Sequence, residues 1–126
     1  MCLIPFAPKE FVMSKGIQTI IYPVSDLAAA KALFGGLADA EPVADAPYYV
    51  GWKVAGQDIG LDPNGHKKGM TGPTAFWHVD DIKQSMQTLL DGGATENEQV
   101  RDVGGGRLVG SVKDADGNVI GLLQDT

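Results

Sequence analysis

The sequence lacks the features of several large protein classes. Its only cysteine is Cys2, so no disulfide bond can form within the chain. That composition is typical of a reducing compartment, and we expect a cytoplasmic protein. No run of about 18 apolar residues is present, so we expect no membrane-spanning segment and no membrane partner.

Basic residues are also scarce. The chain has 10 Lys and Arg against 16 Asp and Glu, which gives a net charge of -6 and a pI near 4.6. Nucleic-acid binding needs a basic face for the phosphates, so we expect no nucleic-acid partner. The glycines at 104–106 precede a strand pattern rather than a helix, so they do not form a phosphate-binding loop. Zinc-ligand spacings and dinucleotide fingerprints are missing as well.

The first 16 residues differ from the rest of the chain. Residues 1–12 hold a short apolar patch and two prolines, without the charged segment that opens a signal peptide. They show no periodic pattern, so we expect the fold to form without them. We expect residues 1–16 to be an N-terminal extension and residues 17–126 to be a single domain.

An internal repeat organises that domain. The segment TIIYPVSDL begins at Thr19, and TAFWHVDDI begins at Thr74, an offset of 55 residues. An apolar helix face follows in each copy: Leu27, Ala30, Leu33 and Phe34 in the first, and Ile82, Met86, Leu89 and Leu90 in the second.

Each predicted helix has polar residues at its start and two glycines at its end. Ser25 or Asp26 can cap the first helix, and Asp80 or Asp81 the second. The glycine pairs at 35–36 and 92–93 predict the two helix ends. The aspartates of HVDDI are therefore interpreted as capping residues rather than as a chemical site.

Three strand patterns follow each helix, although the first of them is weak in the first copy, around residues 41–44. The pattern predicts an α+β domain made of two βαβββ modules, at about 17–62 and 74–125. The linker, residues 63–73, is rich in Gly, Pro and Lys, so we expect a surface loop with an exposed His66.

The modules resemble the vicinal oxygen chelate superfamily, which includes glyoxalase I, bleomycin resistance proteins and extradiol dioxygenases. PVSDL and HVDDI at the strand-to-helix joints and DADGNVIGLLQ at the end carry the resemblance. It implies two modules forming curved mixed sheets around a cup, and the cup is the binding site. It also implies a homodimer, because members commonly build each cup from modules of two chains.

Metal-using members of that superfamily place four ligands in the cup, His or Gln on each first strand and Glu on each last strand. The matching positions here are Thr19, Thr74, Gly60 and Gly121. Glycine has no side chain and threonine hydroxyls are poor ligands, so we expect no metal and no other cofactor. The two glycines would leave room for a bulky ligand, unless they record simple loss of the ligands.

Side chains alternate along a strand, and this assigns the rest of the cup. With Thr19 and Thr74 facing inward, Ile21, Phe76 and His78 face inward as well. Asp58 and Asp62 share a face with Gly60 and would be the first substitutes for missing metal ligands. The face of Trp52 is not settled by the pattern, and we include it as a candidate cup residue. Either Tyr48 or Tyr49 should also reach the cup.

His78 is the candidate catalytic residue, with three possible roles. It lies four residues from Thr74, roughly 13 Å along a strand, so it cannot join a metal centre at Thr74. It could contact a ligand or act as a general base, since its pKa lies near neutrality. It could equally hold a backbone group near the helix start.

These features favour a metal-free small-molecule-binding protein of the glyoxalase/bleomycin resistance type, which would sequester an antibiotic or an aromatic metabolite. An alternative is an enzyme of the superfamily, a lyase, isomerase or dioxygenase, with an unorthodox site or with His78 as base. A third reading is a domain that works with another protein and binds nothing small. The missing metal ligands separate the first reading from the second, and the inward glycines separate it from the third.

Overall fold

The computed structural model describes residues 14–125 and contains the predicted βαβββ order twice. The first module consists of β1 (Ser14–Pro23), α1 (Leu27–Ala38), β2 (Ala44–Ala46), β3 (Tyr49–Val54) and β4 (Gln57–Asp62). After a short 3-10 turn, η1 (His66–Lys68), the second consists of β5 (Thr74–Val79), α2 (Ile82–Asp91), β6 (Thr95–Asp102), β7 (Leu108–Lys113) and β8 (Val119–Gln124).

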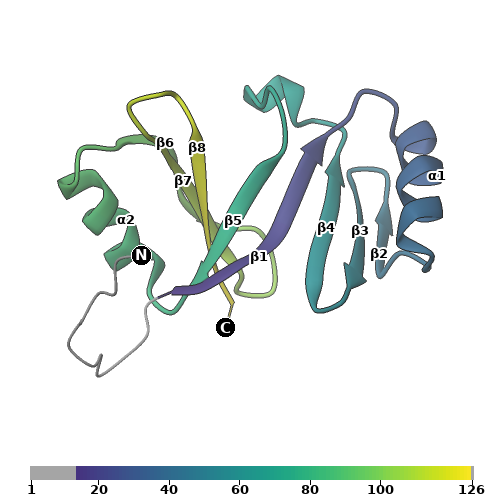
Figure 1. Cartoon of the computed structure of the whole chain (residues 1–126), viewed down its shortest axis with the longest axis horizontal. Coiled ribbons are helices and arrows are strands. Elements are labelled where there is room, and N and C mark those ends of the chain that lie inside the picture. The colour runs from purple at the N-terminus through teal and green to yellow at the C-terminus, as the bar shows by residue number, and fades with distance from the viewer. Residues whose placement is uncertain (1–13, 126) are drawn as a thin grey trace, which may run out of the picture.

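The eight strands form one mixed sheet in the order β2-β3-β4-β1-β5-β8-β7-β6. Within each module the first strand runs parallel to the last, β1 with β4 and β5 with β8. The two first strands pair antiparallel around Ile20 and Ala75 and join the modules. Figure 1 shows β1 and β5 side by side at the centre of the molecule, with α1 and α2 at the two ends of its long axis. The α+β class and the curved open sheet are confirmed.

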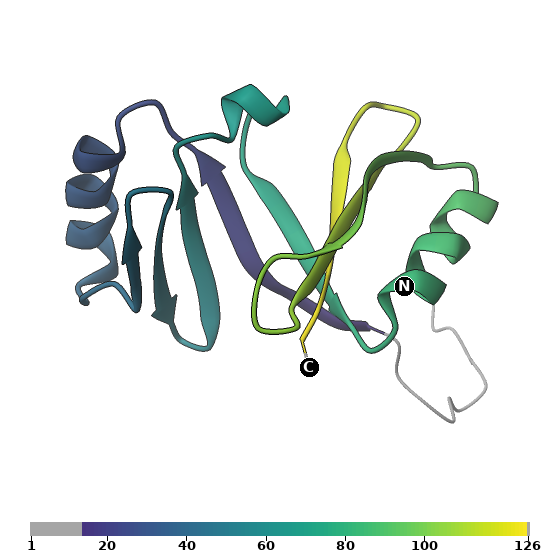
Figure 2. The ribbon, with the colours of Figure 1, turned by 180° about the vertical axis from the view of Figure 1, so that it is seen from behind.

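Each module packs its helix against its own strands. In the first module the buried residues are Val50, Trp52 and Leu61, and Leu27, Ala30 and Phe34 of α1 pack on them. In the second module Ile82 and Met86 of α2 are buried with Val79, Val112 and Leu122. Both helices cover the same face of the sheet, so the opposite face is left for the cup. The view from behind in Figure 2 also shows both helices outside the sheet.

Aspartates cap both helices, and the structure selects between the alternatives. Oδ1 of Asp26 accepts a hydrogen bond from the N–H of Ala29 at 3.0 Å, and Oδ1 of Asp81 accepts from Gln84 at 3.1 Å. A further bond ties α2 to the sheet, because Oε1 of Gln124 accepts from the N–H of Ile82 at 2.8 Å. The aspartates of HVDDI thus belong to the start of the helix, as predicted.

The end of α1 differs from the prediction. The helix runs through the glycines at 35–36 and ends at Ala38, followed by Asp39 in the left-handed region at φ 53°. Each glycine weakens a helix interior by about 1 kcal/mol, and beyond the two glycines Ala38 packs on the first core. The helix face was also partly wrong: Leu33 is 74% exposed, and Ala38 takes its place in the core.

Two strand boundaries also moved. The weak strand of the first module is β2, at Ala44–Ala46 rather than near 41–44. β1 begins at Ser14, three residues before the expected start at 17, and Ser14 pairs with Val79 across an irregular register. Residues 14–16 of the expected extension therefore belong to the sheet, whereas residues 1–13 lie outside the described part of the chain. Over residues 14–125, neither helix has the length and apolar character needed to cross a membrane.

Candidate functional site

A cavity of about 710 Å³ lies on the face of the sheet that the helices leave free. Both modules contribute to it through side chains that alternate with those of the two cores. Four predicted cup residues line it: Thr19, Ile21, Thr74 and Phe76. Its apolar lining includes Ile21, Met70, Phe76, Val109, Val119 and Leu123. The cavity is therefore built within one chain, and its apolar part could hold an organic molecule of moderate size.

The position that matches a metal ligand on β4 is covered by an aromatic ring. Gly51 of β3 and Gly60 of β4 lie opposite each other, and the ring of Tyr49 lies over both. A Cβ added at Gly51 would come within 2.9 Å of Cε2 of Tyr49, and one at Gly60 would meet the hydroxyl of the same ring. Because these two glycines have no side chains, the ring of Tyr49 can lie directly against the backbone of β3 and β4.

The matching position on β8 is covered in the same way. Gly121 pairs with Phe76 of β5, and a Cβ at Gly121 would lie 2.6 Å from Cδ1 of that ring. It would also lie 2.9 Å from the backbone oxygen of Ala75. The expectation that Gly60 and Gly121 leave open space is thus wrong: aromatic rings fill that space, and the glycines let the rings lie flat on the sheet.

Five polar residues gather near one end of the cup, and we call them the polar cluster: Thr19, Asp58, His78, Arg107 and Asp125. The Thr19 hydroxyl lies 2.8 Å from Nε2 of His78 and 3.3 Å from Oδ2 of Asp58. Nδ1 of His78 faces Asp125 at 3.8 Å. The direction of the Thr19–His78 hydrogen bond depends on the tautomer: with the proton on Nδ1, Nε2 accepts from the Thr19 hydroxyl. With the proton on Nε2, that N–H donates to the Thr19 oxygen, and the hydroxyl donates to Oδ2 of Asp58.

Arg107 closes the polar cluster between the two modules. Its guanidinium donates to both carboxylate oxygens of Asp125, at 2.7 and 3.1 Å, and lies 3.5 Å from Asp58 on the other module. Lys53 forms a further ion pair with Asp58 at 3.0 Å. Such paired, two-pronged contacts hold the guanidinium in a fixed orientation.

Burial and charge shift the pKa values of this region. Burial lowers the pKa of His78 below its ordinary value of 6.5, although Asp125 opposes the change. The hydrogen bond from Arg107 lowers the pKa of Asp125. Burial, aided by Asp58, raises the pKa of Tyr49. At neutral pH the cluster therefore combines a neutral imidazole with an ionised Asp125, and the ring of Tyr49 stays uncharged.

The structure places the remaining candidates as follows. Asp58 and His78 face the cup side but belong to the polar cluster, and Asp62, which lines the cavity, pairs with Lys68 at 2.8 Å. Trp52 lies on the opposite face, since it is buried against Phe34 and donates Nε1–H to the Ala40 carbonyl at 3.2 Å. The inclusion of Trp52 in the cup was wrong.

The structure also shows which of Tyr48 and Tyr49 enters the cup and where His66 lies. The ring of Tyr49 lies inside the cup over Gly51 and Gly60, whereas Tyr48 also lines the cavity but is 70% exposed. His66 is exposed in η1. Arg107 and Asp125 were missed by the sequence reading. No local pattern marks them, because β-strand pairing brings them together from residues 18 positions apart.

The residues present do not fit the metal centre of the superfamily. Over residues 14–125 no group of three His, Cys, Asp or Glu side chains is placed to hold a metal ion. Asp58 and Asp62, the suggested substitutes, are both held by lysines, and Asp58 by Arg107 as well. The site offers hydroxyls, one imidazole and aromatic rings in place of a ligand set.

Comparisons with known proteins bear on the fold alone. No protein-family model matches the chain, and no curated protein matches its sequence. A glyoxalase/bleomycin resistance protein/dioxygenase superfamily member from Vibrio splendidus 12B01 superposes with a TM-score of 0.66 at 18% identity, over 86% of this chain and 97% of that one. Methylmalonyl-CoA epimerase from Mycobacterium tuberculosis gives 0.67 at 16% identity, over 90% of each chain.

A third solved structure, the NAD-dependent benzaldehyde dehydrogenase from Legionella pneumophila, gives a TM-score of 0.69 at 12% identity. The superposition covers 86% of this chain and 98% of that one. The chain thus has the fold of the vicinal oxygen chelate superfamily, and the resemblance noted in the sequence is confirmed at that level. The activity is a separate question, because one fold supports many activities.

Proposed function

We propose that this protein binds an apolar or aromatic small molecule in its cup, through its own side chains and without a metal. The observation that carries the proposal is the cover of Gly60 by Tyr49 and of Gly121 by Phe76. At both positions where a metal-using relative would have a carboxylate, this chain presents an aromatic ring.

The cavity supports such a role by its size and lining. Its volume of about 710 Å³ falls in the range of small-molecule sites. Phe76 and Tyr49 offer ring faces to a planar ligand, and Met70 is a flexible side chain that adapts to ligand shape. Sequestration of an antibiotic or aromatic metabolite would need nothing more than these contacts.

Two measurements test the proposal. Elemental analysis after incubation with nickel, zinc, iron and manganese in turn should give well below one equivalent of each. Planar aromatic compounds should bind, with the contacts mapped by amide NMR shifts at Phe76 and Leu123. Tryptophan emission is unsuitable as the readout, because Trp52 lies on the far side of the sheet. One tightly held metal per chain, removed by a chelator together with an activity, would overturn the proposal.

A second candidate function is acid–base catalysis, and one contact favours it. Thr19 lines the cavity, and its hydroxyl lies 2.8 Å from Nε2 of His78, which the lowered pKa keeps neutral. The hydroxyl could pass its proton to Nε2 and take one from a bound ligand in return, a proton transfer that needs no metal.

Proton exchange in a bound acid separates the two candidates. Methylmalonyl-CoA in deuterated water should take up deuterium at its acidic carbon if His78 acts as a base, and His78→Gln should abolish the uptake. Glyoxalase turnover of the methylglyoxal–glutathione adduct can be followed in parallel. Ligand binding without exchange or turnover would leave the binding function and remove the enzymatic one.

A further inference from the structure

The charges that line the cavity differ in sign from those of the whole chain. Within residues 14–125 four Lys and Arg line it, namely Lys68, Arg101, Arg107 and Lys113, but only two Asp and Glu do, namely Asp62 and Glu98. The lining therefore carries two more positive than negative charges, whereas the chain has a net charge of -6. Arg107 is offset by Asp125 and Asp58, which lie just outside the lining, so one positive charge remains in excess. That charge favours an anion even though the chain as a whole is acidic.

Three of these cations already have carboxylate partners. Lys68 pairs with Asp62 at 2.8 Å, and Arg101 with Glu98 at 3.1 Å. The guanidinium of Arg107 is occupied by both oxygens of Asp125. Among the cavity-lining cations of the described chain, Lys113 alone has no ion pair or side-chain hydrogen bond. Its ammonium group is therefore the free positive charge of the cavity.

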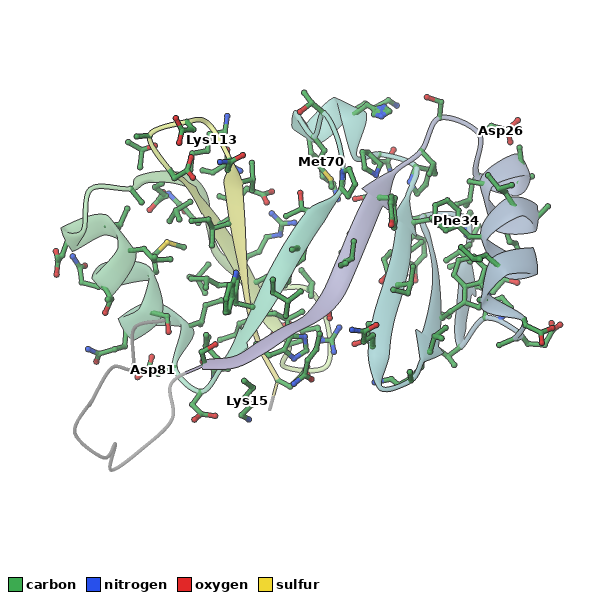
Figure 3. The ribbon with its side chains drawn as sticks, in the orientation of Figure 1. Lys15, Asp26, Phe34, Met70, Asp81 and Lys113 are labelled. Atoms are coloured by element: carbon green, nitrogen blue, oxygen red, sulfur yellow. The ribbon has the colours of Figure 1, made fainter. Side chains whose placement is uncertain are left out.

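The sheet fixes where Lys113 lies relative to the aromatic part. On β7 it shares a face with Val109 and Ser111, and Ser111 pairs with Gly121, the residue beneath Phe76. Two residues along β7 and two strands across the sheet separate Lys113 from Phe76, on the order of 10 Å. Figure 3 shows Lys113 and Met70 along the same, upper edge of the molecule. The end that holds Lys113 is thus the one away from the polar cluster.

From this arrangement we infer that the cup selects an amphipathic anion, with an aromatic or apolar body on Phe76 and a singly charged acid group on Lys113. The inference rests on the proposed binding function and gives it a ligand class. A lysine presents a point charge, and the guanidinium of Arg107, which could grip a phosphate in two places, is held by Asp125. A carboxylate or sulfonate therefore fits the site better than a phosphate.

A matched pair of fluorescent probes tests the inference. 1-Anilinonaphthalene-8-sulfonate has an aromatic body and one anionic group, and N-phenyl-1-naphthylamine has the same body without the charge. The sulfonate should bind more tightly, and its affinity alone should fall as salt is added. Lys113→Gln should lower the affinity for the sulfonate by about two- to fivefold, as expected for the loss of one exposed charge pair. The affinity for the neutral probe should stay unchanged.

Lys83→Gln is the matched control, because Lys83 is exposed on α2 and does not line the cavity. Amide NMR shifts should place both probes at Phe76, and near-ultraviolet circular dichroism should confirm that each variant is folded. Equal affinity for the two probes in the cup, unchanged by Lys113→Gln, would overturn the anion selectivity and leave the binding function intact. Failure of both probes to enter the cup would overturn both.

Discussion

The hydroxyl of Thr19 lies 2.8 Å from Nε2 of His78, across the antiparallel pair of strands that joins the two modules. Both side chains are buried, at 1% and 7% exposure. Thr19 lines the cavity and His78 does not, so this contact connects the cavity to the buried part of the polar cluster. The behaviour of the cluster can therefore be tested through either residue.

Thr19→Val should destabilise the fold by about 1–3 kcal/mol, because it leaves Nε2 of His78 buried without a partner. Thr19→Ser keeps the hydroxyl and loses one buried methyl group, so its cost should be nearer 0.8 kcal/mol. Urea unfolding of the three proteins measures the difference. If valine were tolerated as well as serine, the hydrogen bond to His78 would contribute nothing.

The stability should depend on pH through His78. Because burial lowers its pKa below 6.5, the unfolded chain binds a proton that the folded chain does not, between the folded pKa and 6.5. The free energy of unfolding should therefore fall as the pH drops below 6.5 and level off below the folded pKa. Urea midpoints between about pH 8 and pH 5 give the curve.

His78→Gln should flatten that curve, and His66→Gln, which alters the exposed histidine of η1, should leave it unchanged. The opposite pattern would assign the dependence to His66. The lowered pKa of Asp125 acts in a separate, more acidic window, since its contribution is present above 3.8 and is lost as the pH falls through its folded pKa.

Gly121→Ala should cost about 1–3 kcal/mol, because the new methyl group would meet both the ring of Phe76 and the backbone oxygen of Ala75. Gly60→Ala should have a similar effect through Tyr49. Gly36→Ala provides the control: this helical glycine has nothing within 4 Å, so alanine should stabilise α1 by about 0.5–1 kcal/mol. In thermal melts the midpoints of Gly121→Ala and Gly60→Ala should lie below that of the wild type, and the midpoint of Gly36→Ala should lie above it. A neutral Gly121→Ala would mean that the ring moves away freely.

Self-association stays a prediction, and α1 is where we expect it. The exposed side of this helix includes Leu33 and Leu37, at 74% and 84% exposure, together with Ala28, Ala29, Ala32 and Gly36. None of these six residues is charged, so two copies of a chain with a net charge of -6 would meet there over apolar side chains. Sedimentation equilibrium should give a dimer that Leu37→Lys weakens and Lys83→Gln does not. A wild-type monomer at micromolar concentration would contradict this.

The sequence predicted what depends on local spacing. The 55-residue repeat located both modules, and Asp26 and Asp81 capped the helices as their positions suggested. The end of α1 was predicted less well, because the glycine signal is local whereas the packing of Ala38 on the first core is not. The inward faces of β1, β4 and β5 followed from strand alternation.

The site itself was harder to predict, because its contacts cross the sheet. Strand alternation could not choose a face for Trp52, and only the position of α1 fixes it in the first core. The glycines at 60 and 121 were recognised as unusual, but the rings above them come from residues whose side-chain directions the sequence does not give. Arg107 and Asp125 meet through the pairing of β7 and β8.

The pairing of β1 with β5 has a consequence for how the cup responds to concentration. The two modules that line the cup in this structure belong to one chain and are joined by β1 and β5. Occupancy should then obey simple mass action between one chain and one ligand. Dilution that dissociates an assembly through α1 would leave the dissociation constant unchanged, unless a coupling free energy links that helix to the cup.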